Sequence, residues 1–177
     1  MSYCDLANAL PEGSPDPNKH YHDHEYGFPV ADDRILFERL VLEINQAGLS
    51  WTLILKKRAA FQTAYCGFDI AAVAAFGGKD RARLLADAGI IRNRLKIEAA
   101  IFNAGQILAL QRQYGSFKNW LDAHHPREKT EWVKLFKKHF KFMGGEIVGE
   151  FLMSTGYLAG AHDDTCPVAA KIKARHP

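Results

Sequence analysis

Apolar side chains recur at three- and four-residue spacing along most of the chain after residue 31, which is the pattern of helices that bury one face. The clearest stripe lies between residues 32 and 48 and consists of Leu36, Phe37, Leu40, Val41 and Ile44. Ser50, Asp69 and Asp80 are residue types that cap the start of a helix. We predict further helices over residues 51–65, 93–114, 116–123, 130–139 and 146–154. The fold class is therefore predicted to be all-α.

The first 30 residues differ from the rest of the chain. Residues 1–30 are rich in Pro, Gly, Asp and His and lack apolar periodicity, so we expect an irregular arm there. No segment alternates apolar and polar residues in the manner of a strand. The connections between the predicted helices are short. We therefore predict a helical bundle that forms a single domain over residues 1–177.

Length and composition place few limits on function. The 177 residues are 47% hydrophobic and 24% charged, which is enough for a substantial core. The N-terminus has no basic start followed by an apolar run, and no stretch approaches the roughly 18 apolar residues of a membrane span. We expect a cytoplasmic protein that does not enter a membrane.

The positive charge is clustered, although the formal net charge is only +3. The cations fall into four groups along the chain: Lys56, Lys57 and Arg58; Arg92, Arg94 and Lys96; Lys137, Lys138 and Lys141; Lys171, Lys173 and Arg175. Such groups would bind nucleic-acid phosphates if the fold brought them to one face. Ordinary solvated helix faces explain them equally well.

Two of the predicted helices form a tight hairpin. Residues 80–89 and 93–114 are joined by the segment Gly89-Ile90-Ile91-Arg92. This is the layout of a helix-hairpin-helix element over residues 80–114, in which backbone N–H groups and nearby cations hold a DNA phosphate. The predicted DNA-binding residues are Gly89, Ile91, Arg92, Arg94 and Lys96. The alternative is that Gly89 only ends the first helix.

Histidines and cysteines near the two ends of the chain suggest a metal site. His162 and Cys166 stand four residues apart, a spacing at which both reach one tetrahedral ion. Cys4 and the histidines at positions 20, 22 and 24 offer the remaining two ligands. A site with four protein ligands has no open position and would tie the N-terminal arm to the tail over residues 160–177. Unrelated surface histidines and free thiols are the alternative.

Glu43 falls at the margin of the apolar stripe between residues 32 and 48, where a charge is costly unless it has a purpose or a partner. A buried carboxylate near Trp51 and Tyr21 would hydrogen-bond the polar edge of a cationic base that stacks on the rings. The alternatives are an ion pair with Arg39 or a side chain that leans out to water.

Five segments together resemble the 3-methyladenine DNA glycosylase I family: YHDHEYG, LEINQAGLSW with ILKK, DAGIIRNRLKI, FKFMGG and GAHDDTC. They occur in order and span nearly the whole chain. The resemblance implies an all-helical, helix-hairpin-helix DNA glycosylase with one structural zinc. It implies that the zinc ligands are Cys4, His22, His162 and Cys166, and that Tyr21, Glu43 and Trp51 line the base pocket.

The chain also departs from the family's usual pattern. Tyr26-Gly27 stands in place of the usual Trp-Gly, and Leu6 replaces an aromatic residue that is common after the first cysteine. Glu146 and Glu150 lie four residues apart in the final apolar helix, where the family usually has a Thr-containing entry. The range of lesions is therefore left open.

The resemblance implies hydrolysis of the N-glycosidic bond of 3-methyladenine in damaged duplex DNA by a monomer. Tyr21 and Trp51 would stack on the base, while Glu43 would bind its amino edge or position the water. A zinc-stabilised nucleic-acid-binding module without activity, or a glycosylase for another lesion, is the main alternative. A zinc hydrolase ranks last, because four protein ligands leave no place for a metal-bound water.

Overall fold

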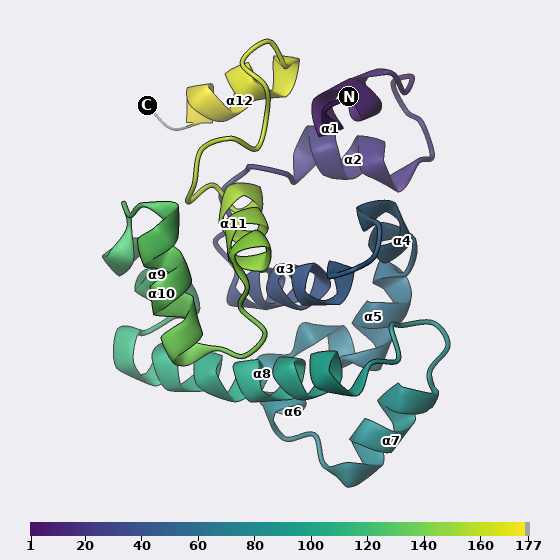
Figure 1. Cartoon of the computed structure of the whole chain (residues 1–177), viewed down its shortest axis with the longest axis vertical. Helices are drawn as coiled ribbons and strands as arrows, with labels where there is room; N and C mark the ends of the chain where they lie inside the picture. Colours follow the sequence, from purple (N-terminus) through teal and green to yellow (C-terminus); the bar gives the residue numbers. More distant parts are fainter. Residues whose placement is uncertain (176–177) are drawn as a thin grey trace. The chain divides into compact units, whose positions relative to one another are not determined.

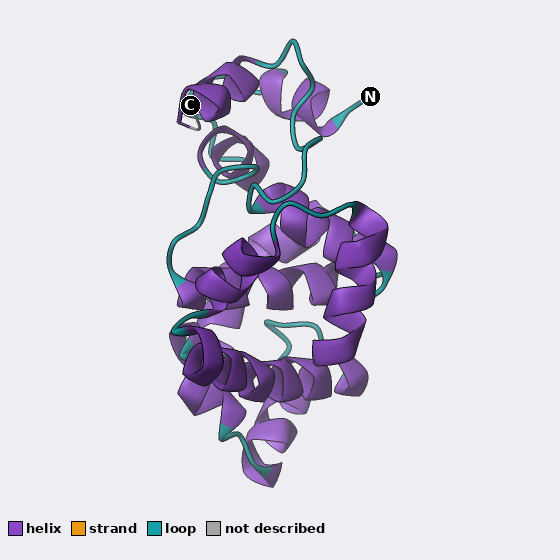
Figure 2. Cartoon of the chain, turned by 90° about the vertical axis from the view of Figure 1, so that its left-hand side faces the viewer, coloured by secondary structure: helices purple, strands orange, loops and turns teal. Residues whose placement is uncertain are grey.

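A computed structural model describes residues 1–175 of the chain, and these residues form helices and loops with no strand (Figure 2). The all-α prediction is confirmed. Within the described residues no helix is both long and apolar enough to cross a membrane. The contacts group the chain into two compact units. Unit 1 comprises residues 1–29 and 152–177, and unit 2 comprises residues 30–151.

Unit 1 is built from both ends of the chain. It contains α1 (Tyr3–Asn8), α2 (Pro17–His24) and α12 (Pro167–Arg175), together with the end of α11 (Gly145–Ser154). The prediction of an irregular arm over residues 1–30 is wrong, because local capping starts two helices there. Ser2 and Asp5 form a capping box for α1, and Asp16 caps α2, whose first residue is a proline.

Unit 2 holds the remaining helices, which run along its chain in the following order (Figure 1): α3 (Asp33–Gln46), α4 (Trp51–Lys56), α5 (Arg58–Ala64), the 3₁₀ turn η1 (Cys66–Phe68), α6 (Ile70–Ala74), α7 (Gly78–Ala86), α8 (Arg94–Tyr114), α9 (Phe117–His124), α10 (Lys129–His139) and the start of α11. The stripe predicted between residues 32 and 48 is fully buried on α3. The 21-residue α8 contacts α3, α6 and α9. These apolar contacts form the core that supports α3.

Two helix boundaries differ from prediction. The helix predicted over residues 51–65 is divided at Lys57, whose N–H donates both to Leu53 and, as in a 3₁₀ turn, to Ile54. Asp80 is not an N-cap. It lies inside α7 and accepts a 3.0 Å hydrogen bond from the N–H of Gly77, which is the cap.

One acidic side chain joins three helices of unit 2. Asp33, the first residue of α3, accepts hydrogen bonds from the backbone N–H groups of Phe117 and Lys118 and from the side chain of Gln111. A carboxylate is stabilised at the N-terminus of α9 because that end of a helix presents unpaired N–H groups. Asp33 therefore holds α3 against α8 and α9.

Candidate functional site

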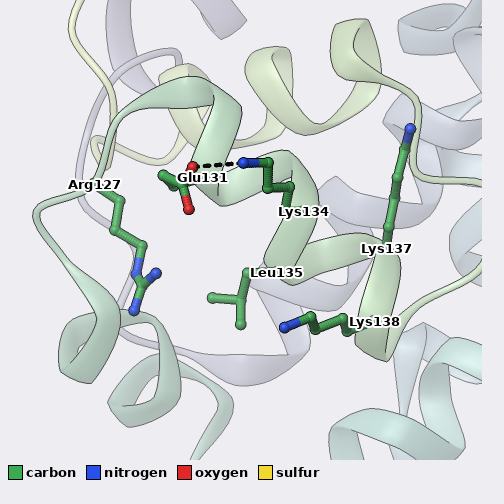
Figure 3. A pocket seen from close by; sticks show the side chains of 6 residues that line it. All are labelled: Arg127, Glu131, Lys134, Leu135, Lys137 and Lys138. Carbon is green, nitrogen blue, oxygen red and sulfur yellow. Dashed lines mark hydrogen bonds and ion pairs between the residues drawn. The ribbon is translucent and has the colours of Figure 1, made fainter.

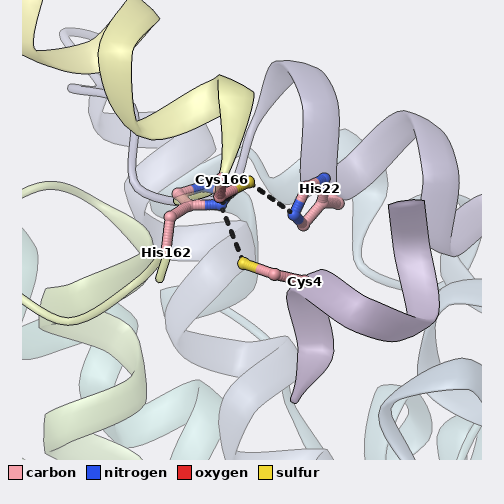
Figure 4. A group of neighbouring side chains, drawn as sticks. All are labelled: Cys4, His22, His162 and Cys166. Carbon is pink, nitrogen blue, oxygen red and sulfur yellow. Dashed lines mark hydrogen bonds between the residues drawn. The ribbon is translucent and has the colours of Figure 1, made fainter. Parts of the chain in front are cut away.

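Four metal-ligating side chains meet in unit 1, although they come from opposite ends of the chain. The ligand atoms of Cys4, His22, His162 and Cys166 all lie within 4.8 Å of one another (Figure 4). Cys4 lies on α1, His22 on α2, and the other two in the segment that leads into α12. These are the four residues that the family resemblance predicted. His20 and His24 are exposed and contact each other instead.

The spacing of the four side chains fits tetrahedral zinc. Ordinary Zn–S and Zn–N bond lengths place sulfur and nitrogen about 3.6 Å apart in such a site. The Nδ1 atom of His162 lies 3.6 Å from the Cys4 sulfur and 3.7 Å from the Cys166 sulfur. The Nε2 atom of His22 lies 3.6 Å from the Cys166 sulfur. Two thiols and two imidazoles are also a common donor set for structural zinc.

The second nitrogen of each histidine is held by an acceptor. His22 Nδ1 lies 2.7 Å from a carboxylate oxygen of Asp23, and His162 Nε2 lies 2.6 Å from the carbonyl oxygen of Tyr26. These contacts favour the tautomers in which His22 Nε2 and His162 Nδ1 carry lone pairs directed at the cluster. Metal-ligating histidines are usually oriented in this way.

The sulfur atoms receive hydrogen bonds that suit thiolates. The N–H of Asp163 donates to Cys4 at 3.4 Å, and the side-chain amide of Asn8 donates to Cys166 at 3.7 Å. The pKa of Cys4 is raised to about 11, chiefly by burial and in part by the neighbouring Cys166, while the hydrogen bond from the Asp163 N–H opposes the rise. A cation at the cluster would oppose this effect by stabilising the charged thiolates.

Aromatic rings surround the same cluster. Tyr26 makes edge contacts with Tyr3 and His162, and its ring lies 5.8 Å from that of Tyr21.

Gly27 has a φ of +83°, and a Cβ atom there would lie 2.9 Å from the Cβ of Ala161. Glycine is therefore required at position 27, because the backbone conformation and the close approach both exclude a side chain.

Glu43 is buried in the middle of α3, with 3% of its surface exposed. Its pKa is raised to about 8, chiefly by burial and in part by the negative charge of Glu150, while Arg39 opposes both effects. Arg39 is itself buried one helical turn before Glu43. The carboxyl group is thus largely protonated at neutral pH and flanked by charges of both signs.

Trp51 begins the next helix after Glu43. It is the first residue of α4, and the Ser50 hydroxyl caps this helix by accepting from the N–H of Leu53 at 3.2 Å. The Trp51 ring is half-buried. Glu43 and Trp51 both belong to unit 2, whereas Tyr21 is buried in unit 1.

The connector between α7 and α8 covers residues 87–93 and is shaped by Asp87. This residue ends α7, and its carboxylate accepts a 2.8 Å hydrogen bond from the N–H of Gly89. A Cβ atom at Gly89 would lie 2.9 Å from the Cβ of Ala60 on α5. Arg92 and Arg94 are exposed and Ile91 is half-buried, so the two arginines are accessible to a charged partner.

Lys96 does not occupy the position that the DNA-binding prediction requires. It is 5% exposed, and its ammonium group donates to the carbonyl oxygens of Asn45 and Ala47 at 2.9 and 2.7 Å. We therefore replace the predicted DNA contact with a structural role. The end of α3 presents unpaired carbonyls, which attract a cation from the start of α8.

The sequence model of the methyladenine glycosylase family matches residues 13–135. A DNA-3-methyladenine glycosylase 1 from Escherichia coli is 37% identical over 77% of this chain and 83% of its own length. The corresponding enzyme from Haemophilus influenzae is 34% identical over 83% and 89%. A crystal structure of a 3-methyladenine DNA glycosylase I variant in complex with 3-methyladenine has a TM-score of 0.81 at 32% identity, covering 95% of this chain and 97% of its own.

The chain belongs to the methyladenine glycosylase family. Its fold agrees with a second member, the 3-methyladenine DNA glycosylase I of Staphylococcus aureus, with a TM-score of 0.78 at 33% identity over 88% of this chain and 93% of the relative. Three of the four clustered ligands, Cys4, His162 and Cys166, lie outside the segment that the family model matches.

Sequence reasoning missed several residues that support these sites in this family member. Asp23 directly follows the predicted ligand His22, a signal that would have identified it as the carboxylate that orients the ring. Lys57 was assigned only to a basic group, yet its ammonium donates to the carbonyls of Ala88 and Gly89 in the connector. No local pattern identifies Asn8, because its partner Cys166 is distant in sequence.

Proposed function

We propose that this chain is a DNA glycosylase that hydrolyses the N-glycosidic bond of 3-methyladenine in duplex DNA. The observation that carries the proposal is the buried Glu43, which lies under the electrostatic influence of Glu150 in a member of the methyladenine glycosylase family. Relatives over most of the chain are named for this activity.

The leaving group makes this chemistry undemanding. A purine methylated at N3 carries a delocalised positive charge in DNA, so its bond to the sugar is already weak. Water adds to the sugar carbon as that bond breaks, and the products are the neutral base, an abasic site and a proton. The protein has to flip the nucleotide out of the duplex, at a cost of a few kcal/mol, and hold the base.

Glu43 is suited to select a cationic base. Without a ligand its raised pKa of about 8 keeps the carboxyl largely neutral at pH 7. A cation placed beside it favours the ionised form, which then attracts the cation. Neutral adenine carries no charge that would favour ionisation of Glu43, so it gains no such attraction. We therefore assign Glu43 to recognition of the alkylated base rather than to positioning of the water.

The flat sides of the base require a different kind of contact. Trp51 is half-buried at the start of α4, and an aromatic ring stacks well on a cationic heterocycle. We assign base stacking to Trp51. Tyr21, a residue of unit 1, keeps the stacking role that the family resemblance predicts.

The connector over residues 87–93 supplies the proposed DNA contact of a helix-hairpin-helix element. Its exposed Arg92 and Arg94 would neutralise phosphates, while backbone N–H groups near Gly89 and Ile91 would hold a phosphate without reading sequence. Lys57 and Asp87 fix the shape of this connector.

Zinc fits the cluster of Cys4, His22, His162 and Cys166, and when bound it would cross-link the two chain ends. Four protein ligands leave no position for substrate or water, so the proposed chemistry does not involve the metal. The roles of the surrounding residues follow from this arrangement. Asp23 and the Tyr26 carbonyl orient the imidazoles, and Asn8 stabilises a thiolate.

The decisive experiment measures base release from methylated duplex DNA by chromatography. We compare the parent with Glu43→Gln and with Glu12→Gln, which makes the same change at an exposed carboxyl. The parent and Glu12→Gln should release 3-methyladenine, while Glu43→Gln should be slower by about tenfold or more, equivalent to about 1.4 kcal/mol. Affinity for undamaged DNA should be equal in all three.

Other outcomes would contradict specific parts of the proposal. Equal losses of base release and of undamaged-DNA binding in Glu43→Gln would remove its role in base recognition. Release of a different base would show that the altered α11, with Glu146 and Glu150, has changed the specificity. DNA binding without any release would favour the non-catalytic binding module.

A further inference from the structure

The outward face of α10 carries a dense group of cations around a surface hollow. The hollow has a volume of about 380 Å³ and is lined by Arg127, Glu131, Lys134, Leu135, Lys137 and Lys138 (Figure 3). We call Arg127, Lys134, Lys137 and Lys138 the α10 basic face. It lies in unit 2 and includes none of the residues assigned above to base recognition or to the connector.

The helix geometry explains why these cations point outward. Trp132 and Phe136 lie one turn apart and are fully buried. Residues 131, 134 and 138 are separated by three or four positions on the other side of α10, so their side chains share the exposed side, and Arg127 is exposed just before the helix begins. The core contacts of Trp132 and Phe136 thus determine which side of α10 faces solvent.

The net charge of residues 127–141 exceeds that of the whole chain. Residues 127–141 contain six Lys or Arg side chains and two Glu side chains, a formal charge of +4. The complete chain has a formal charge of +3, so the other residues together carry −1. Ordinary solvated helix faces usually balance the two signs, whereas in this segment the cations outnumber the carboxylates six to two.

Much of this charge is available to a ligand. Lys134 pairs with Glu131 at 2.9 Å, and the Arg127 side chain donates to the carbonyl of His124 at 2.9 Å. Lys137 and Lys138 are exposed, and the structure of residues 1–175 gives neither of them an ion pair or hydrogen bond. Glu131 lies under the electrostatic influence of Lys134, Arg127 and Lys138, so one carboxylate faces three cations and the group keeps a net positive charge.

The segment that directly follows α10 is fixed to α8. The side chain of Asn103 accepts from the N–H of Lys141 at 2.8 Å and donates to its carbonyl at 3.1 Å. The Lys141 ammonium lies 4.3 Å from the centre of the Phe102 ring. Asn103 is ten residues beyond the α8 N-cap Asn93, which corresponds to about 15 Å along the helix. The α10 basic face is therefore separate from the connector over residues 87–93.

We infer that the α10 basic face is a second phosphate-binding surface, which contacts the DNA backbone away from the connector. The choice of DNA as the ligand rests on the proposed function, in which DNA is the substrate. A group of cations that outnumbers its carboxylates binds phosphates without sequence preference. Such a contact holds the protein on undamaged DNA while the base pocket is empty.

The composition of the face argues against two other classes of partner. A helix that lies on a membrane inserts its apolar side, but the apolar side of α10 is buried in the core by Trp132 and Phe136. Protein interfaces have an apolar centre that is depleted of lysine. Leu135 is the one apolar residue that lines the hollow, and it is only half-exposed.

The test compares two double variants with the same loss of charge. Lys137→Gln with Lys138→Gln changes the α10 basic face, and Lys171→Gln with Lys173→Gln changes two exposed lysines on α12. Binding to a short undamaged DNA duplex is measured by fluorescence anisotropy from 50 to 200 mM salt. Each lost phosphate contact should reduce the salt slope of log K by about 0.9, so the α10 variant should lose about 1.8.

Raising the salt from 50 to 200 mM weakens DNA binding in both proteins. The factor by which affinity falls should be about twelve times smaller for the α10 variant than for the parent. The α12 variant should keep the parent slope. Equal changes in both variants, no change in the α10 variant, or a parent that prefers anionic lipid vesicles to DNA would each overturn the inference. The assay involves no bond cleavage, so a parent that binds DNA but releases no base contradicts only the proposed function.

Discussion

The ammonium nitrogen of Lys96, at the start of α8, lies 2.7 Å from the carbonyl oxygen of Ala47, at the end of α3. A second bond to the carbonyl of Asn45, at 2.9 Å, joins the same two helices. Burial lowers the pKa of Lys96, yet the two carbonyls compensate for its removal from water. The contact anchors the loop that connects Glu43 to Trp51.

Replacing Lys96 by Met should destabilise the protein without changing how it binds DNA. The buried carbonyl of Asn45 and the half-buried carbonyl of Ala47 would lose their donor, at a cost of about 1–3 kcal/mol for a buried group. Urea unfolding monitored by circular dichroism measures this loss. The salt slope of duplex binding should match that of the parent. A slope reduced by about 0.9 would instead restore Lys96 as a phosphate contact.

The metal cluster predicts one zinc ion per chain, measurable by atomic emission after purification in chelator-free buffer. Cys166→Ser should abolish binding and lower the melting temperature, because the cross-link between the chain ends is lost. Asp23→Asn should weaken zinc affinity about 10- to 100-fold, since it removes the carboxylate that orients His22.

Cys66→Ser is the matched control for the zinc experiment. Cys66 is a free, exposed cysteine in η1 and lies outside the cluster. This variant should bind zinc like the parent. Equal zinc loss in Cys66→Ser and Cys166→Ser, or full zinc content in Cys166→Ser, would rule out the proposed ligand set.

The raised pKa of Glu43 makes a prediction about stability and pH. The folded protein keeps a proton on this carboxyl up to about pH 8, whereas the unfolded chain releases it near the ordinary value of 4.5. Between these values the folded state binds more protons, so the free energy of unfolding should fall as the pH rises. Urea unfolding at pH 5, 6.5 and 8 measures the trend.

Glu43→Gln isolates this effect, because its amide does not titrate while the histidines and cysteines are unchanged. The advantage of the parent over the variant should be greatest near pH 5 and should diminish towards pH 8. A difference that grew with pH would mean that Glu43 is ionised in the folded protein.

Two glycines should respond in opposite directions to the same substitution. Gly89→Ala places a Cβ atom 2.9 Å from that of Ala60, so the connector must shift, at a cost of about 1–3 kcal/mol. Gly105→Ala, inside α8, meets nothing within 4 Å and should stabilise the protein by about 0.5–1 kcal/mol. Thermal unfolding distinguishes the two, and a destabilised Gly105→Ala would contradict this account of packing.

The sequence alone determined most helices, because their signals are local. Ser50 and Asp69 cap α4 and α6 as predicted, since a cap bonds to backbone groups within three residues. The apolar stripe of α3 is buried as its spacing required. The same locality explains the error over residues 1–30, where capping signals were present but apolar periodicity was not.

Tertiary structure decided the properties that depend on distant partners. Spacing alone left three histidines as candidate ligands, and only the folded chain brings His22 within 3.6 Å of Cys166. In the sequence, Lys96 is indistinguishable from the exposed cations beside it. Only the folded chain shows that its ammonium binds a carbonyl at the end of α3. The sequence did not distinguish the group containing Lys137 and Lys138 from the other three basic groups. In the structure, Trp132 and Phe136 are buried, so Lys137 and Lys138 face solvent. Short-range hydrogen bonds form helices, whereas the environment of a charge depends on residues that folding brings from elsewhere in the chain.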